Sequence, residues 1–174
     1  MTARAAIVTV SDRASRGEYE DKGGPACEAW LRGVVTSPLA VSREIIPDGR
    51  DSVATCLRRL VAEGADLILV TGGTGPAPRD ETPEGAALVI EKELAGFGEE
   101  MRRASLREVP TAILSRQTAG IAGHSLIITL PGKPAAIATC LGAVFAAVPY
   151  CLDLIGAARI ETDPVQITAF RPKA

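Results

Sequence analysis

The sequence predicts a single-domain α/β protein in which a mostly parallel sheet carries helices on both faces. The chain has 174 residues, a length typical of one compact domain, which we expect to span residues 1–174. Short apolar runs typical of buried strands alternate with segments whose apolar residues recur at helical spacing, and this alternation favours a parallel sheet. The composition, 47% hydrophobic and 23% charged, is that of an ordinary globular protein.

The net charge and hydropathy of the chain argue against nucleic-acid and membrane partners. Nineteen basic and twenty-one acidic residues give a net charge of −2, and no basic run occurs, so we expect no nucleic-acid partner. The first apolar run, residues 5–10, is too short for the apolar region of a signal peptide. We also find no stretch long enough to span a bilayer. The expectation is a cytoplasmic protein without a membrane partner.

The cysteines and histidine exclude several familiar chemistries. Cys27, Cys56, Cys140 and Cys151 are far apart and form no CxxC pair, which predicts reduced thiols, the first three on apolar helix faces. His124 is the one histidine, so the sequence does not favour a histidine-based metal site or a Ser-His-Asp triad.

The first predicted strand, residues 6–10, ends at Ser11 and Asp12 in a polar loop. In open α/β sheets, loops at this end of a strand bind ligands, although Ser11 and Asp12 fit a capping role equally well. Pro25 suits the first turn of the next helix. We assign the apolar face of that helix to small and aromatic residues at helical spacing: Ala26, Ala29, Trp30 and Gly33.

The second predicted strand, residues 41–46, partly alternates apolar and polar side chains and leads to Asp48. Asp48 is a carboxylate just beyond a strand end; its simplest role is to cap a turn or a helix. A one-sided apolar stripe predicts a helix that begins near residue 51 or 52 and stops at Gly64.

A buried third strand, residues 67–70, runs into the glycine-rich loop 71–80, which organises the rest of the chain. Glycines let the backbone turn sharply or approach a ligand closely, and a helix is expected to begin near Thr82. Strand, glycine turn and helix N-terminus together form an arrangement that can hold a phosphate. A flexible loop is the alternative, but two prolines favour a fixed shape. The residues expected to contact the anion here are Thr71, Gly72, Gly73, Thr74, Gly75 and Pro76, with Asp80 at the loop end.

This loop is neither of two common phosphate loops. It lacks the third glycine of the dinucleotide fingerprint, and Gly132-Lys133 precedes Pro134 rather than the Ser or Thr of a Walker motif.

The second half predicts helices at about residues 83–94 and 98–108, with Met101 and Leu106 in the core. A buried strand at residues 126–130 follows. Pro134 then opens an apolar helix that Pro149 should kink or stop, and a final extended segment is expected near residues 165–170.

Four polar loops therefore end four predicted strands: Ser11-Asp12, Asp48, residues 71–80 and residues 131–134. In a parallel sheet these loops share one edge and can converge on one pocket. The residues by themselves indicate an anion or nucleotide site there.

The loop sequences also resemble one known family, the MoaB/Mog-type molybdenum-cofactor biosynthesis proteins. The resemblance covers nearly the whole chain, and TGGTG with a downstream aspartate and PGxP is a specific combination. Between Leu141 and Val148 this chain is shorter than the enterobacterial form. The matching motifs are Ser11-Asp12-Arg13, Asp21-Lys22-Gly23, Ile46-Pro47-Asp48, residues 71–80, Thr82-Pro83-Glu84, Ser115-Arg116-Gln117 and Leu130-Pro131-Gly132-Lys133-Pro134.

The resemblance implies a three-layer α/β/α fold and a reaction. ATP, with Mg²⁺, would donate its adenylyl group to the terminal phosphate of molybdopterin, releasing pyrophosphate. Asp48 and Asp80 match the family's essential aspartates and are the candidate Mg²⁺ ligands. The resemblance also implies a homotrimer and a transient contact with a molybdenum insertase. The alternatives are a MoaB-type paralogue and a non-catalytic pterin-binding module.

The substrate-binding set that we carry over from this resemblance extends beyond the glycine loop. Its remaining members are Ser11, Asp12, Thr82, Glu84, Ser115, Arg116, Pro131, Gly132 and Pro134.

Overall fold

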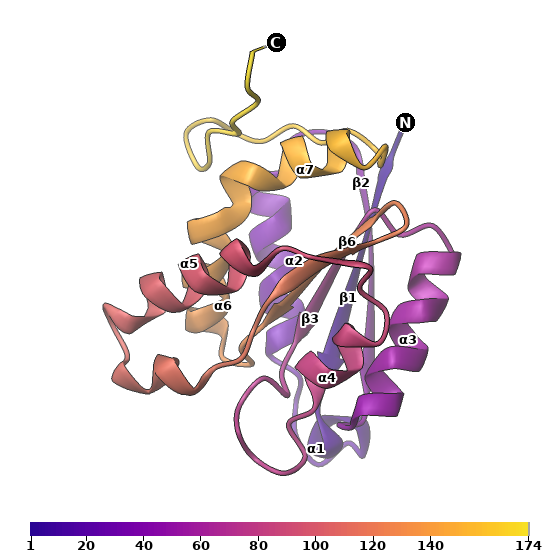
Figure 1. Cartoon of the computed structure of the whole chain (residues 1–174), viewed down its shortest axis with the longest axis vertical. Coiled ribbons are helices and arrows are strands. Elements are labelled where there is room, and N and C mark those ends of the chain that lie inside the picture. Colours follow the sequence, from indigo (N-terminus) through magenta and orange to yellow (C-terminus); the bar gives the residue numbers. More distant parts are fainter. Residues whose placement is uncertain (174) are drawn as a thin grey trace.

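A six-stranded sheet forms the middle layer of the computed structural model, which describes residues 1–173 (Figure 1). The strand order is β2-β1-β3-β6-β5-β4. The first four strands are parallel, whereas β5 runs antiparallel to β6 and β4 antiparallel to β5. The strands are β1 (Ala3–Val10), β2 (Leu39–Ile46), β3 (Leu67–Thr71), β4 (Lys92–Glu93), β5 (Ala119–Ala122) and β6 (Ser125–Leu130).

Helices cover both faces of this sheet. In Figure 1, α2, α5, α6 and α7 lie over one face, and α3 and α4 lie over the other. The α-helices are α1 (Asp12–Ser15), α2 (Gly23–Val34), α3 (Arg50–Ala62), α4 (Thr82–Ala87), α5 (Ala95–Leu106), α6 (Pro134–Val144) and α7 (Val148–Leu154), and the 3-10 helices are η1 (Pro110–Leu114) and η2 (Phe145–Ala147). The predicted mostly parallel sheet with two helical layers is therefore confirmed.

Alternation along the strands builds a separate core on each face. In β1, Ile7 packs under α2 and α6, whereas its neighbour Val8 packs under α3. Successive strand residues point to opposite faces, so a strand in the middle of the sheet must be apolar on both. β3 and β6 accordingly contain no exposed residue.

The antiparallel edge was not predicted, and the helix expected at residues 83–94 begins where predicted but is shorter. Only Thr82–Ala87 is helical, because the chain then turns to pair Lys92 and Glu93 with β5. Gly120 makes this approach possible, since a Cβ there would overlap Ile90 and the Lys92 carbonyl. Pairing with a neighbouring strand has overridden local helical spacing.

Two assignments of buried faces were also wrong. Leu106, expected in the core, is 38% exposed at the end of α5, whereas Met101 is fully buried as predicted. In α2, Ala29 and Gly33 are exposed. The buried stripe consists instead of larger residues at the same spacing, Cys27, Leu31 and Val34, whose burial removes more apolar area from water.

Near the C-terminus, residues 165–170 form no strand within the described chain; residues 164–166 make a turn. The apolar helical stretch from residue 134 is interrupted at η2, just before Pro149, where a kink or stop was predicted.

That stretch corrects the expectation that no segment could span a membrane. Residues 134–154 form a helical stretch of 21 residues that could cross a membrane, judged by its length and composition alone. Its inward residues are at most 7% exposed and pack in the core beneath α2 and α5. We therefore interpret it as a core helix.

Candidate functional site

The parallel strands end at one level and deliver their loops to one place. Val10 of β1 pairs with Ile46 of β2, Thr9 with Thr71 of β3, and Thr71 with Leu130 of β6. In Figure 1 the loop after β3 lies beside α1 and the start of α3. The predicted convergence of the four loops is confirmed in the fold.

The glycine loop is packed too tightly to carry side chains at its start. Gly72 and Gly73 have φ angles of 98° and 65°, a region that favours glycine. A Cβ at Gly72 would overlap the Val10 carbonyl, and one at Gly73 would overlap the Thr82 hydroxyl and lie 3.2 Å from Asp48 Oδ1. The backbone at Gly73 thus lies directly against the Asp48 carboxylate.

Thr82 fixes the shape of the turn at Gly72 and Gly73 through two hydrogen bonds. Its side chain is fully buried. Its hydroxyl donates to the Gly72 carbonyl at 2.8 Å, and its backbone N–H donates to the Gly73 carbonyl at 3.0 Å. Thr82, a predicted substrate-binding residue, thus holds the loop through its hydroxyl.

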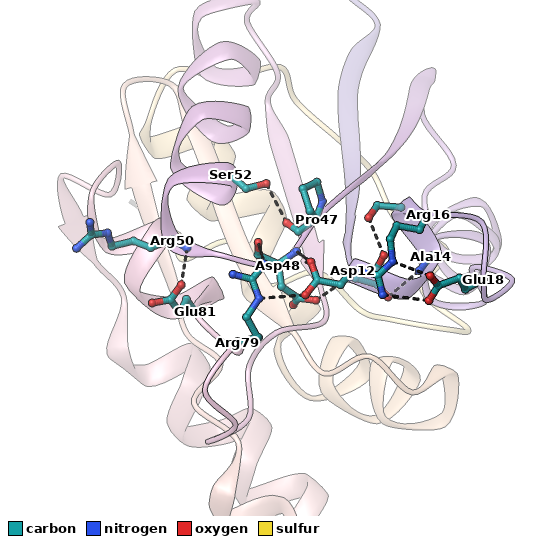
Figure 2. A network of polar contacts seen from close by, with 12 residues as sticks. Asp12, Ala14, Arg16, Glu18, Pro47, Asp48, Arg50, Ser52, Arg79 and Glu81 are labelled. Atoms are coloured by element: carbon teal, nitrogen blue, oxygen red, sulfur yellow. Dashed lines mark hydrogen bonds and ion pairs between the residues drawn. The ribbon is translucent and has the colours of Figure 1, made fainter.

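Asp12 and Asp48 exchange hydrogen bonds between the loops after β1 and β2 (Figure 2). The Asp12 N–H donates to Asp48 Oδ2 at 2.7 Å, and the Asp48 N–H donates to Asp12 Oδ1 at 3.1 Å. Asp48 is therefore not a helix cap: Gly49 occupies the N-cap of α3, with no side-chain cap. Ser11, in contrast, is the N-cap of α1 and accepts from the Ala14 N–H.

The surroundings of Asp48 disfavour its negative charge. Burial raises its pKa, and the negative charges of Asp12 and Asp80 raise it further, while the hydrogen bond from the Asp12 backbone lowers it. Of its two carboxylate oxygens, Oδ2 accepts from Asp12 and Oδ1 faces Gly73. A cation or a hydrogen-bond donor beside Oδ1 would stabilise this carboxylate.

Arg79 is the cation that joins these carboxylates. Its Nε and Nη2 donate to the two Asp12 oxygens at 3.0 and 3.1 Å, and Nη2 also donates to the Asp48 carbonyl at 2.9 Å. The Arg79 guanidinium lowers the pKa of Asp12, mainly through these hydrogen bonds. Figure 2 shows the three side chains meeting at the strand ends.

The far side of the glycine loop is clamped by Arg116. Its guanidinium donates to the carbonyls of Gly75 and Asp80 and forms an ion pair with Glu84. Asp80 braces the same turn by accepting from the Ala77 N–H at 3.1 Å. Arg116 and Glu84, both expected to bind substrate, thus support the loop backbone here.

We call the turn at Gly72 and Gly73 the cradle. Two clefts open beside it, and Gly132 lines both of them. One, about 310 Å³, has largely apolar walls that include Val109, Ala112 and Pro131, and Ser115 and Lys133 also line it. The other, about 150 Å³, lies between the loop after β1 and Gly72, with Lys22 beside it. The larger volume falls in the range of small-molecule sites.

A bigger cleft, about 560 Å³, lies on the other side of Arg116 and contains no residue of the glycine loop. We place the chemistry beside the two smaller clefts, because Ser11, Thr71, Gly72 and Gly132 line them, whereas Asp48 and Asp80 line neither.

The acidic groups suit a metal that needs few protein ligands. Among the described residues, no three His, Cys, Asp or Glu side chains form a metal-binding cluster. Asp48 and Asp80 lie close enough for their charges to interact, and Asp48 directs an oxygen at the cradle. Mg²⁺ is commonly held by one or two carboxylates together with substrate phosphates, so this pair fits it.

Comparison with known proteins gives this geometry a context. Residues 6–150 match the family model described as "Probable molybdopterin binding domain". The chain belongs to this family.

Relatives within the family are similar over nearly their whole length. The molybdopterin adenylyltransferase of Helicobacter pylori J99 is 50% identical over 173 residues, covering 99% of this chain and 98% of the relative. That of Escherichia coli K12 is 45% identical over 186 aligned positions, with 99% and 95% covered. The molybdopterin biosynthesis enzyme MoaB of Thermus thermophilus superposes with a TM-score of 0.82 at 40% identity, covering 91% of this chain and 99% of that one.

The structure brings together most of the family residues predicted from sequence. Thr71 donates its hydroxyl to the Pro131 carbonyl, which joins the ends of β3 and β6. The hydroxyls of Thr74 and Ser115 lie 3.5 Å apart, so the glycine loop also meets the segment after η1. Two predicted residues lie aside: Pro76 is exposed on the loop, and Pro134 opens α6 without lining either smaller cleft.

From the sequence, Arg79 counted only as a charge within the glycine-rich loop 71–80 and was not placed among the site residues. The available signal was a lone arginine next to Asp80 in an otherwise small-residue loop. Its partners, Asp12 and Asp48, lie 67 and 31 residues away in sequence.

Proposed function

We propose that this chain transfers the adenylyl group of ATP to the terminal phosphate of molybdopterin and releases pyrophosphate. The observation that carries the proposal is the junction of Asp12, Asp48 and the glycine loop, in a chain similar end to end to molybdopterin adenylyltransferases. The similarity to a MoaB structure favours the MoaB-type role as the second candidate.

The reaction joins two anions, so the protein must bind, orient and neutralise them. A molybdopterin phosphate oxygen attacks the α-phosphorus, the bond to the β-phosphate oxygen breaks, and pyrophosphate leaves. The positive-φ turn at Gly72 and Gly73, which packs against the Val10 carbonyl and the Thr82 hydroxyl, would shape the loop around a phosphate. The apolar walls of the 310 Å³ cleft suit a flat heterocycle whose phosphate reaches the cradle.

Asp48 and Asp80 would hold the Mg²⁺. When bound, the ion would neutralise phosphate charge and orient the transferred group. We further propose that Ser11, Asp12, Thr71, Ser115 and Gly132 line the substrate path.

The remaining substrate-site residues act on the loop itself in this proposal. Thr82 and Arg116 hold its carbonyls, and Glu84 pairs with Arg116. Their part in substrate binding is therefore to keep the cradle in shape.

The wider setting follows the same proposal. Residues 1–174 would form one molybdopterin-binding domain that assembles as a homotrimer in the cytoplasm and passes its product to a molybdenum insertase. Sedimentation of the purified protein checks the trimer directly.

Pyrophosphate formation tests the function. The purified protein with molybdopterin, ATP and Mg²⁺ should form one pyrophosphate for each molybdopterin consumed, and none when molybdopterin or Mg²⁺ is omitted. Tight binding of molybdopterin without pyrophosphate would refute the enzyme and leave a pterin-binding module.

A further inference from the structure

The junction of the first three parallel-strand loops depends on one side chain outside the predicted site. The Asp48 backbone is held on both sides: its N–H donates to Asp12 Oδ1, and its carbonyl accepts from Arg79 Nη2. Arg79 also holds both oxygens of Asp12. The guanidinium therefore fixes Asp48 directly and, through Asp12, indirectly.

We propose that Arg79 is the positioning residue for Asp48, which keeps its free carboxylate oxygen aimed at the backbone of Gly73. The inference rests on the proposed function, and it adds a residue that acts through Asp48 and Asp12 rather than by contact with substrate.

The charges show why such a residue is needed. Asp12 and Asp48 follow the ends of β1 and β2 and are hydrogen-bonded to each other, and Asp80 closes the glycine loop, so three carboxylates gather around this junction. Arg79 pairs with Asp12 and acts favourably on Asp48, so it offsets the repulsion where the loops meet. Its planar guanidinium reaches the Asp12 carboxylate and the Asp48 carbonyl at once, which a lysine ammonium does not match.

The ion pair adds little to overall stability. The Arg79 side chain is 62% exposed, and exposed pairs contribute little because solvent screens them. A variant at this position should therefore stay folded, and a change in activity would report on the geometry of the site.

The test compares Arg79→Gln and Arg79→Lys with Arg16→Gln. Arg16 is a matched control, since it is 57% exposed, follows β1 as well and forms its ion pair with another carboxylate, Glu18. Its charge also acts on Asp12 but its side chain forms no hydrogen bond with it, so it controls for the loss of a nearby positive charge. Removing a residue that orients another group typically costs about 10–100-fold in activity. We expect Arg79→Gln to lower kcat by about that factor while KM for molybdopterin changes by no more than about twofold. The kcat of Arg79→Lys should lie between those of wild type and Arg79→Gln. Arg16→Gln should have the wild-type kcat and KM.

A double-mutant cycle shows whether Arg79 acts through Asp12. Asp12→Asn removes the charge that Arg79 binds but leaves an oxygen for the Asp48 N–H. If the proposal is right, Asp12→Asn and Arg79→Gln together lose little more activity than either alone. Fully additive losses would contradict it, and so would a raised KM with unchanged kcat, which would mean that Arg79 grips the substrate itself.

A second measurement is independent of activity. The backbone amides of Asp12 and Asp48 are hydrogen-bonded across the two loops, so they should be protected from hydrogen exchange in the free protein. Arg79→Gln should speed exchange at both, and Arg16→Gln at neither. This measurement does not depend on whether the wild-type protein forms pyrophosphate. Unchanged protection of both amides in Arg79→Gln would overturn the inference, and lost protection would uphold it.

Discussion

The substitution Asp48→Asn separates a structural carboxylate from a catalytic one. Asparagine keeps an oxygen that can accept the 2.7 Å hydrogen bond from the Asp12 N–H, so the link between the two loops remains. What it removes is the negative charge. Burial and the charges of Asp12 and Asp80 already disfavour that charge and raise the pKa of Asp48. We therefore expect the melting temperature to stay the same or to rise.

Activity should change in the opposite direction. The oxygen that is lost, Oδ1, lies 3.2 Å from the position that a Cβ would take at Gly73, so it faces the phosphate cradle. Removing one preorganised electrostatic group typically costs about 10²–10³ in rate, or roughly 2.7–4 kcal/mol of transition-state stabilisation. A substitution that raises the melting temperature while it lowers the reaction rate identifies a group that contributes to catalysis and destabilises the folded protein.

Single-turnover pyrophosphate release at saturating Mg²⁺, beside a thermal melt, measures both quantities. Asp51→Asn is the matched control, because Asp51 lies in the first turn of α3 and its side chain is 84% exposed. That variant should keep the wild-type rate. A wild-type rate in Asp48→Asn, or a loss of rate that only follows a loss of stability, would refute the reasoning and leave Asp48 a structural residue.

Four further outcomes are expected. Asp80→Asn should keep its turn, because asparagine can also accept from the Ala77 N–H, yet lose most adenylyl transfer in the same single-turnover assay. Gly73→Val should distort the turn at Gly72 and Gly73, because its Cβ would overlap the Thr82 hydroxyl at a φ of 65°, and should therefore weaken calorimetric binding of molybdopterin and ATP strongly in protein that circular dichroism shows to be folded; unchanged affinity would exclude the cradle. Glu84→Gln should lower stability by less than about 1 kcal/mol at neutral pH. Arg116 holds the Glu84 pKa below its usual range, so denaturant unfolding should show this difference disappearing as pH falls through that lowered pKa. Thiol titration should find four free thiols after denaturation and Cys151 reacting first in the folded protein, since burial raises the pKa of all four thiols but Cys151 alone is partly exposed; fewer than four would mean a disulfide.

The parallel part of the fold could be predicted because its signals are local. Runs such as residues 67–70 and 126–130 are largely apolar on both faces, and a glycine or proline follows each within two residues. The antiparallel edge could not, because β4 is only two residues long and is defined by its partner. Leu106 was misplaced for a related reason: its spacing from Met101 does not show where the covering layer ends.

At the site, the sequence located the loops but could not assign their contacts. Asp48 before a predicted helix has the pattern of a cap, yet it bonds to Asp12, 36 residues away. Thr82 and Arg116 were grouped with substrate-binding residues by motif, whereas their polar atoms are directed to loop carbonyls. Motif membership indicates that a residue serves the site, and only the folded geometry separates groups that face the ligand from those that hold the loop.

The apolar stretch at residues 134–154 has a consequence for how the protein is made. By length and composition it could be taken for a membrane segment while it is unfolded. It leaves the ribosome after the sheet, α2 and α5, the elements that cover it, have already been synthesised. A circular permutant that begins at residue 134 would reverse this order, exposing the stretch before its partners exist, and should aggregate or associate with membranes during synthesis although its final contacts are the same.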